Sequence, residues 1–317
     1  MKKFLSLLLT LAVLLSLAAC HGDPATSSLA ESEASTEAVT SSEESSSEAS
    51  KEPASSSEES SKASSAETSS YDEDVPFTPI ASVKDYFESK TYSGDLVDVH
   101  YLFHEPIRDT GKDYPLVIFL HGLGDTVNVN ALGTASQLVN SLIKLENRSE
   151  KYSTYTLIPS TPLSNEGWWT TDQLTSFKAL ISRLAKDYDI DLSRVYIMGI
   201  SMGGMVTCQL LNEVAPYSFA AAVPMSGANN LRNPEALSAT AIRIYHVASD
   251  PVVNVSQSRN LYSQLKNSGH PKAEYIEFEF GSHTSPLNDV FIEDREEFFD
   301  WLFAQRLPTG QFSQFYW

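Results

Sequence analysis

Gly199-Ile200-Ser201-Met202-Gly203-Gly204 is the segment around which the interpretation of this sequence is built. Residues 194–198 before it are apolar and rich in β-branched and aromatic side chains, which predicts a buried strand. Residues 202–214 after it carry apolar side chains at helical spacing. A Gly-x-Ser-x-Gly between a strand and a helix holds the serine on a sharp turn with its hydroxyl exposed. Glycine is needed on both flanks because a Cβ there would strike the neighbouring strand or helix. Ser201 is therefore the predicted nucleophile.

Residues 1–20 predict a bacterial lipoprotein signal. They begin with Met-Lys-Lys, continue as an apolar run too short for a stable membrane anchor, and end in Leu-Ala-Ala-Cys. In signals of this kind the cysteine, here Cys20, becomes the lipidated first residue of the mature protein. We therefore expect a lipid anchor at Cys20 and a location on the extracellular face of the cell membrane. The alternatives are an ordinary secretory signal and an uncleaved anchor.

Residues 21–74 predict a disordered tether. This segment consists mainly of Ser, Glu, Ala and Thr, and it cannot bury enough apolar surface to offset the entropy of ordering. Its 14 acidic and 2 basic residues account for −12 of the chain's net charge of −19. The acidity therefore belongs mostly to the tether, and it argues against a nucleic-acid partner.

Residues 75–317 predict one catalytic domain of the α/β class. Apolar runs of strand length occur at 115–120, 155–159, 219–225, 241–247 and 273–280, and a half-exposed strand is expected at 95–103. Helical spacing is found at 131–145, 174–188, 255–265 and 289–305, after a short amphipathic piece at 82–90. Strands that alternate with helices predict a mainly parallel central sheet with helices on both faces. Ligands bind such sheets at the C-terminal ends of the strands.

A serine hydroxyl is a weak nucleophile, so Ser201 needs a base within hydrogen-bond reach and an acid that orients the base. Among the seven histidines, His283 leaves the last predicted strand at the C-terminal edge. His121 leaves a strand at the same edge but belongs to the loop expected to bind the oxyanion, and His246 lies inside a strand. His283 is therefore the predicted base, and the alternative is a solvated loop histidine.

Asp250 is the predicted acid of the triad. It stands where the strand 241–247 ends, and Pro251 after it prevents further strand pairing. The alternative is an aspartate that opens a turn or caps the next helix. The chain order Ser201, Asp250, His283 is the order that a Gly-x-Ser-x-Gly serine on a parallel sheet requires.

Two backbone N–H groups are expected to bind the developing oxyanion, those of Leu123 and Met202. Met202 follows the nucleophile directly, and Leu123 lies in the loop after the strand 115–120. Gly122 and Gly124 would let the backbone at Leu123 approach the reacting atom closely.

Several segments together resemble one family, the extracellular serine esterases of the α/β-hydrolase superfamily. They are Leu-His-Gly-Leu-Gly-Asp at 120–125, Asp-Leu-Ser-Arg-Val-Tyr at 191–196 leading into the Ser201 turn, Phe-Ala-Ala-Ala-Val-Pro at 219–224, Asp-Pro-Val-Val at 250–253 and Asp-Trp-Leu-Phe-Ala-Gln at 300–305. The chain looks similar to carbohydrate esterase family 1, feruloyl esterases and polyhydroxybutyrate depolymerases. This resemblance implies an α/β-hydrolase fold and an esterase that uses no metal or cofactor. Relatives often carry a tryptophan shortly after the catalytic histidine, where this chain has Thr284-Ser285-Pro286.

The substrate expected from the family is an acetyl or feruloyl ester on a polysaccharide. Trp168 and Trp169, in a loop at the catalytic edge, are candidates for stacking on a sugar ring or an aryl group, although either could belong to the core. Cys208 lies on the helix after the nucleophile and is expected to be a small apolar core residue without a disulfide partner.

Two other functions remain open at this point. A peptidase of the prolyl-oligopeptidase type would use the same fold and triad, but no propeller or gating domain is expected upstream, only a tether. A non-catalytic lipoprotein that binds carbohydrate at the cell surface would keep the fold with a vestigial triad.

Overall fold

The computed structural model describes residues 78–108, 110–125, 127–160, 170–214 and 218–308. Cys20, the tether 21–74 and both tryptophans at 168 and 169 lie outside the described residues, so their roles stay predictions. No helix in the described ranges is long and apolar enough to cross a bilayer.

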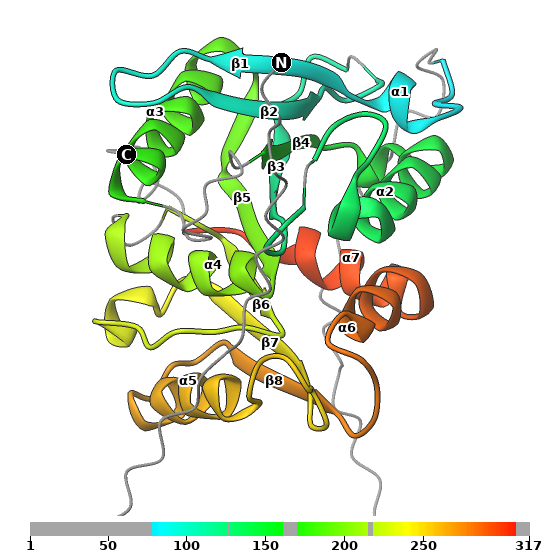
Figure 1. Ribbon diagram of the computed structural model, residues 1–317. Helices are drawn as coiled ribbons and strands as arrows, with labels where there is room; N and C mark the ends of the chain where they lie inside the picture. Colours follow the sequence, from blue (N-terminus) through cyan, green and yellow to red (C-terminus); the bar gives the residue numbers. More distant parts are fainter. Residues whose placement is uncertain (1–77, 109, 126, 161–169, 215–217, 309–317) are drawn as a thin grey trace, which may run out of the picture. The chain divides into compact units, whose positions relative to one another are not determined.

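An eight-stranded sheet in the order β1-β2-β4-β3-β5-β6-β7-β8 forms the centre of the described residues (Figure 1). The strand β2 pairs antiparallel with both β1 and β4, and all other neighbours are parallel. The strands are β1 (Glu88–Tyr92), β2 (Val99–His104), β3 (Tyr114–Leu120), β4 (Tyr155–Ser160), β5 (Ile190–Ile200), β6 (Ala221–Met225), β7 (Ala241–Val247) and β8 (Ala273–Phe278).

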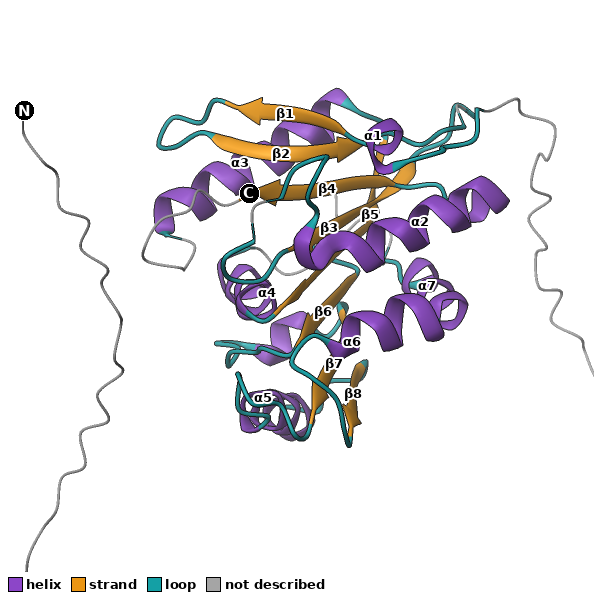
Figure 2. Cartoon of the chain, turned by 45° about the vertical axis from the view of Figure 1, so that its right-hand side comes forward, coloured by secondary structure: helices purple, strands orange, loops and turns teal. Residues whose placement is uncertain are grey.

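Helices cover both faces of this sheet. The helices α3 (Thr171–Asp187), α4 (Met202–Glu213) and α5 (Ser256–Asn267) pack on one face. The other face is covered by α1 (Val83–Tyr86), α2 (Ser136–Arg148), α6 (Ser285–Asn288) and α7 (Arg295–Ala304). Figures 1 and 2 show these two sets on opposite sides of the strands. Shorter helical turns are η1 (Gly133–Ala135), η2 (Glu150–Tyr152), η3 (Pro234–Leu237) and the π-helical turn η4 (Asp289–Glu293).

The central strands are buried on both faces because their side chains alternate between two hydrophobic cores. In β3, Leu116 and Ile118 join the core under α3 and α4, whereas Val117 and Phe119 join the core under α2 and α7. Cys208 is fully buried in the first of these cores, as expected, and burial raises the pKa of its thiol to about 12.

The predicted mainly parallel sheet with helices on both faces is confirmed, with two local corrections. The amphipathic piece at 82–90 is a one-turn helix followed by the edge strand β1, whose mostly exposed residues carry little hydrophobic signal. The helix predicted over 289–305 is divided into η4 and α7 at Asp294.

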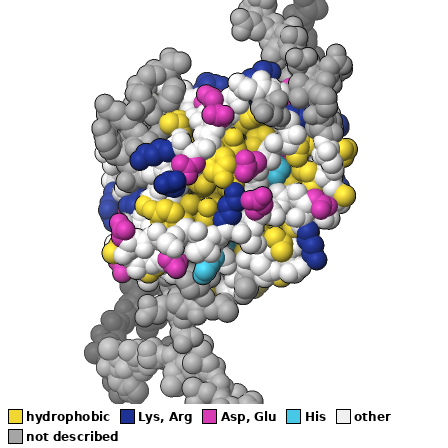
Figure 3. Space-filling model, turned by 90° about the horizontal axis from the view of Figure 1, so that it is seen from above, with side chains coloured by type: hydrophobic (Ala, Val, Ile, Leu, Met, Phe, Trp, Pro, Cys, Tyr) yellow, Lys and Arg dark blue, Asp and Glu magenta, His cyan; other side chains and the backbone are white. Residues whose placement is uncertain are grey.

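Charged side chains of both signs occur together on one face of the described residues (Figure 3). On the face that Figure 3 shows, basic and acidic side chains lie beside one another around hydrophobic ones.

The turn around Ser201 is packed so closely that only glycine fits at two positions. A Cβ on Gly203 would lie 2.0 Å from the backbone oxygen of Leu120, and one on Gly199 would lie 2.5 Å from the backbone of Gly203. These contacts press the start of α4 against the end of β3. The sharp turn expected from the sequence thus has a direct steric cause.

Replacing Gly203 with alanine should destabilise the protein by about 1–3 kcal/mol or more, because the new methyl group collides with backbone that cannot rotate away. Urea unfolding followed by circular dichroism measures this change. Ser263→Ala on the exposed face of α5 is a control expected to stay within about 0.5 kcal/mol. A Gly203→Ala variant as stable as the wild type would contradict the steric explanation.

Candidate active site

Ser201 occupies a strained turn between β5 and α4. Its backbone has φ 57° and ψ −119°, a conformation that L-residues rarely adopt. The turn is held by a hydrogen bond of 2.8 Å from the Ser201 amide to the carbonyl oxygen of Met225 at the end of β6. The turn therefore fixes Ser201 between the end of β5 and the first residue of α4.

The structure brings Asp250 and His283 together. The His283 Nδ1 atom lies 2.7 Å from Asp250 Oδ2, although the two residues are 33 positions apart in the chain. Asp250 follows β7 and His283 follows β8, and these strands are parallel neighbours. Because a carboxylate only accepts, Nδ1 carries the hydrogen and the Nε2 atom of a neutral imidazole is left as a base.

The other carboxylate oxygen of Asp250 is held by backbone. Its Oδ1 atom accepts hydrogen bonds from the amides of Val252 at 2.8 Å and Val253 at 3.1 Å. Burial of the Asp250 side chain opposes ionisation, but the hydrogen bonds from His283 and from these two amides outweigh it and lower the pKa of the carboxyl group. Asp250 is therefore ionised at neutral pH, as an acid that stabilises an imidazolium must be.

Within the described residues, no hydrogen bond connects the side chains of Ser201 and His283. The His283 Nε2 atom is buried and has no hydrogen-bond partner among the described residues. Both side chains belong to loops at the C-terminal edge of the sheet, after β5 and β8. Hydrogen bonds between catalytic groups commonly tighten only when substrate binds. The roles of Ser201, Asp250 and His283 in catalysis are accordingly part of the proposal below.

The loop carrying Leu123 is fixed beside the nucleophile by a side-chain clamp. Asp125 Oδ2 accepts hydrogen bonds from both the amide and the hydroxyl of Thr134, at 2.9 and 2.6 Å. The Thr134 hydroxyl oxygen in turn accepts the amide N–H of Gly122 at 3.1 Å. A Cβ on Gly122 would lie 3.9 Å from Ser201 Cβ, so this loop passes close to the nucleophile.

Met202 starts α4 directly after Ser201. The first amides of an α-helix have no partner within the helix, so the Met202 N–H is a suitable oxyanion donor. Leu123 is 68 % exposed and lies in the clamped loop. Both predicted donors therefore lie on segments that border Ser201, Leu123 in the clamped loop and Met202 at the first position of α4.

His246 is a contact of Asp250 that the sequence interpretation missed. Its Nε2 atom lies 3.2 Å from Asp250 Oδ2 and 3.1 Å from the carbonyl oxygen of Val253. Both neighbours are acceptors, so Nε2 carries the hydrogen, and Nδ1 accepts from the Ser258 hydroxyl at 2.7 Å. Burial lowers the pKa of His246, which keeps it neutral. Its place inside β7, one position before the last residue of the strand, could have suggested this role.

No cluster of three or more histidine, cysteine, aspartate or glutamate side chains suited to a metal ion occurs within the described ranges. The imidazole of His121 is buried in the loop after β3, with Nδ1 2.8 Å from the Gly122 carbonyl oxygen.

The sheet topology and the sharp turn between β5 and α4 define the α/β-hydrolase fold. Residues 150–299 match the family described as phospholipase/carboxylesterase. The chain is 27% identical over 189 residues to a bifunctional acetylxylan esterase/xylanase of Neocallimastix patriciarum, which covers 60% of this chain and 26% of that protein. It is also 27% identical over 135 residues to feruloyl esterase B of Neurospora crassa, covering 39% of this chain and 43% of that enzyme. The chain thus spans less than half the length of these two relatives.

Solved structures agree with this fold. A thermostable esterase superposes with a TM-score of 0.58 and 28% identity, over 71% of this chain and 64% of that one. An acylaminoacyl peptidase of Pyrococcus horikoshii superposes with a TM-score of 0.51 and 15% identity, over 68% and 41% of the two chains. At 15% identity, the similarity to the peptidase shows a shared fold and nothing about function.

Replacing His246 with leucine should slow the reaction of Ser201 with a fluorophosphonate probe by about 10- to 100-fold, because Asp250 loses a donor in a buried site. His246→Gln, which can still donate to Asp250, should stay within a few-fold of the wild type. Ser201→Ala is the control for labelling at the intended residue, and thermal melting checks that each variant is folded. Equal losses in the leucine and glutamine variants would contradict a role through the donated hydrogen bond.

Proposed function

We propose that the protein is a carboxylic ester hydrolase that uses Ser201, His283 and Asp250 as a catalytic triad. The observation that carries this proposal is the 2.7 Å hydrogen bond between His283 and Asp250, at the same sheet edge as the strained turn of Ser201. The match of residues 150–299 to phospholipase/carboxylesterase proteins and the two esterase relatives support esters as the substrates.

In the proposed reaction, Ser201 Oγ attacks the ester carbonyl carbon while His283 Nε2 takes the hydroxyl proton. The negative charge on the carbonyl oxygen faces the N–H groups of Leu123 and Met202. When the carbon–oxygen bond to the alcohol breaks, His283 gives its proton to the departing alkoxide and an acyl-serine remains. A water molecule, deprotonated by His283, then attacks the acyl-serine. The bond to Ser201 Oγ breaks, His283 returns the proton to this oxygen, and the acid is released. Asp250 holds the imidazole in the required tautomer and stabilises its positive charge.

For the substrate, we extend the proposal to acetyl or feruloyl esters attached to polysaccharide. The names of the relatives, an acetylxylan esterase/xylanase and a feruloyl esterase, support this class. Three large apolar side chains on the loops of the catalytic edge also favour an aryl acyl group. Leu123, Val252 and Phe280 are 68, 68 and 77 % exposed, and they follow β3, β7 and β8 respectively. Exposed apolar groups gathered at a site indicate an apolar ligand.

The activity is tested by the hydrolysis of p-nitrophenyl acetate and of methyl ferulate, with a prolyl p-nitroanilide as the amide comparison. The wild type should cleave the esters, and Ser201→Ala should lose about 10⁵-fold or more in kcat. The proposal fails if Ser201→Ala keeps full esterase activity. Faster cleavage of the amide would favour a peptidase, and the absence of any turnover or probe labelling would favour a protein that only binds.

Phe280→Ala should lower kcat/KM for methyl ferulate by about tenfold, because the aryl group loses a large apolar contact. The same variant should change kcat/KM for p-nitrophenyl acetate far less, since the acetyl group is small. Leu96→Ala, at a similarly exposed leucine on the loop before β2, is the matched control. An equal effect of Phe280→Ala on both esters would exclude Phe280 as a determinant of the acyl group.

A further inference from the structure

A cavity of about 530 Å³ lies at the edge of the sheet opposite the candidate active site. Its walls come from the N-terminal ends of β3 and β5, from the segment before β4, and from the end of α7. Arg194 in β5 lines it, whereas Ser201 follows the other end of the same strand, roughly 23 Å away at 3.3 Å per residue. The volume is in the range of small-molecule sites. This cavity is therefore separate from the site described above.

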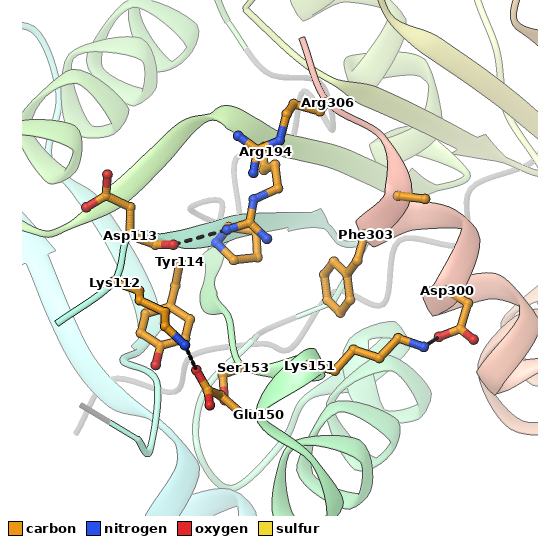
Figure 4. A pocket seen from close by; sticks show the side chains of 12 residues that line it. Lys112, Asp113, Tyr114, Glu150, Lys151, Ser153, Arg194, Asp300, Phe303 and Arg306 are labelled. Carbon is orange, nitrogen blue, oxygen red and sulfur yellow. Dashed lines mark hydrogen bonds and ion pairs between the residues drawn. The ribbon is translucent and has the colours of Figure 1, made fainter. Parts of the chain in front are cut away.

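The charges around the cavity are balanced. Figure 4 shows Lys112 beside Glu150 and Lys151 beside Asp300, with nitrogen–oxygen distances of 3.3 and 2.5 Å. Two arginines on the opposite wall, Arg194 and Arg306, share Asp191 just behind them, at 2.6 and 3.0 Å. Because the cations are already paired with carboxylates, a polyanion would gain little electrostatic binding energy in this cavity. The lining instead offers donors and acceptors side by side, which suits a neutral ligand rich in hydroxyl groups.

Two residues that line the cavity each have a side-chain oxygen without a partner. Glu150 Oε2 and Ser153 Oγ are buried and have no hydrogen-bond partner among the described residues. The Glu150 side chain is only 8 % exposed and Ser153 only 2 %. Buried polar atoms are nearly always hydrogen-bonded in native proteins, so an unpartnered pair on a cavity wall indicates a ligand that supplies the missing donors. A carboxylate oxygen can only accept, and a hydroxyl group of a ligand would donate to it.

The cavity also has an apolar wall. Figure 4 shows the ring of Phe303 between Arg194 and Lys151. This ring is partly exposed and rests on the buried ring of Tyr196, with centroids 5.8 Å apart. A flat apolar surface beside paired charges matches a pyranose ring, which has apolar C–H faces and hydroxyl groups around its rim.

We propose that this cavity binds a segment of a neutral polysaccharide, separately from the chemistry at Ser201. Glu150 Oε2 and Ser153 Oγ accept hydrogen bonds from sugar hydroxyls, the basic side chains donate to sugar oxygens, and Phe303 packs against a ring face. The cavity would hold the protein on a polysaccharide chain while the candidate active site, at the opposite edge of the sheet, binds the ester. The binding itself does not depend on the proposed esterase activity.

The test is affinity electrophoresis of the full chain through gels that contain soluble neutral xylan, in the Ser201→Ala background so that no ester is cleaved. Xylan should slow the migration, and Glu150→Ala and Arg306→Ala should each weaken the apparent binding by about tenfold or more. Glu296→Ala and Arg183→Ala, which remove exposed ion-pair partners that do not line the cavity, are the matched controls and should migrate as the parent does.

The proposal is overturned if xylan does not slow the parent, if both cavity variants bind as the parent does, or if only anionic polygalacturonate causes the shift. Arg306 is half-exposed, so its variant keeps the test decisive if Glu150→Ala does not fold. With Ser201 intact, the cavity variants should hydrolyse p-nitrophenyl acetate at the parental rate. Loss of polysaccharide binding and loss of ester turnover are thus measured separately, and either proposal can fail without the other.

Discussion

The contact between Gly203 and the backbone oxygen of Leu120 is the constraint on which the candidate site depends. Because no side chain fits between them, the start of α4 lies directly against the end of β3. That contact places Ser201 next to the loop that carries Leu123, the arrangement on which the proposed nucleophile and oxyanion donors rely. The backbone of Ser201 adopts a conformation that costs about 1–3 kcal/mol, which packing elsewhere in the protein must offset.

A second constraint acts on Asp250, both of whose carboxylate oxygens meet donors. Oδ2 lies against His283 and His246, and Oδ1 accepts from the amides of Val252 and Val253. The carboxylate is buried yet ionised, and its position is determined by backbone as much as by side chains. Because backbone amides anchor the carboxylate, Asp250 in turn fixes the position of the His283 Nδ1 atom.

The sequence could predict the sheet because its central strands are apolar on both faces, a pattern that few other structures produce. The strand β1 could not be predicted this way, since most of its residues face solvent and only pairing with β2 defines it. At the site, turn chemistry and chain order were enough to place Ser201, Asp250 and His283 at one edge. The contact of His246 with Asp250 and the cavity at the opposite edge depend on distances between separate elements, which no local pattern encodes.

The left-handed backbone at Ser201 has an evolutionary consequence. Glycine adopts such dihedral angles without strain. A glycine at this position would therefore relieve the backbone strain and stabilise the fold, but it would remove the serine hydroxyl group. Selection for stability and selection for the proposed chemistry would therefore favour different residues at this position. A lineage released from the demand for turnover would be free to drift toward the more relaxed residue.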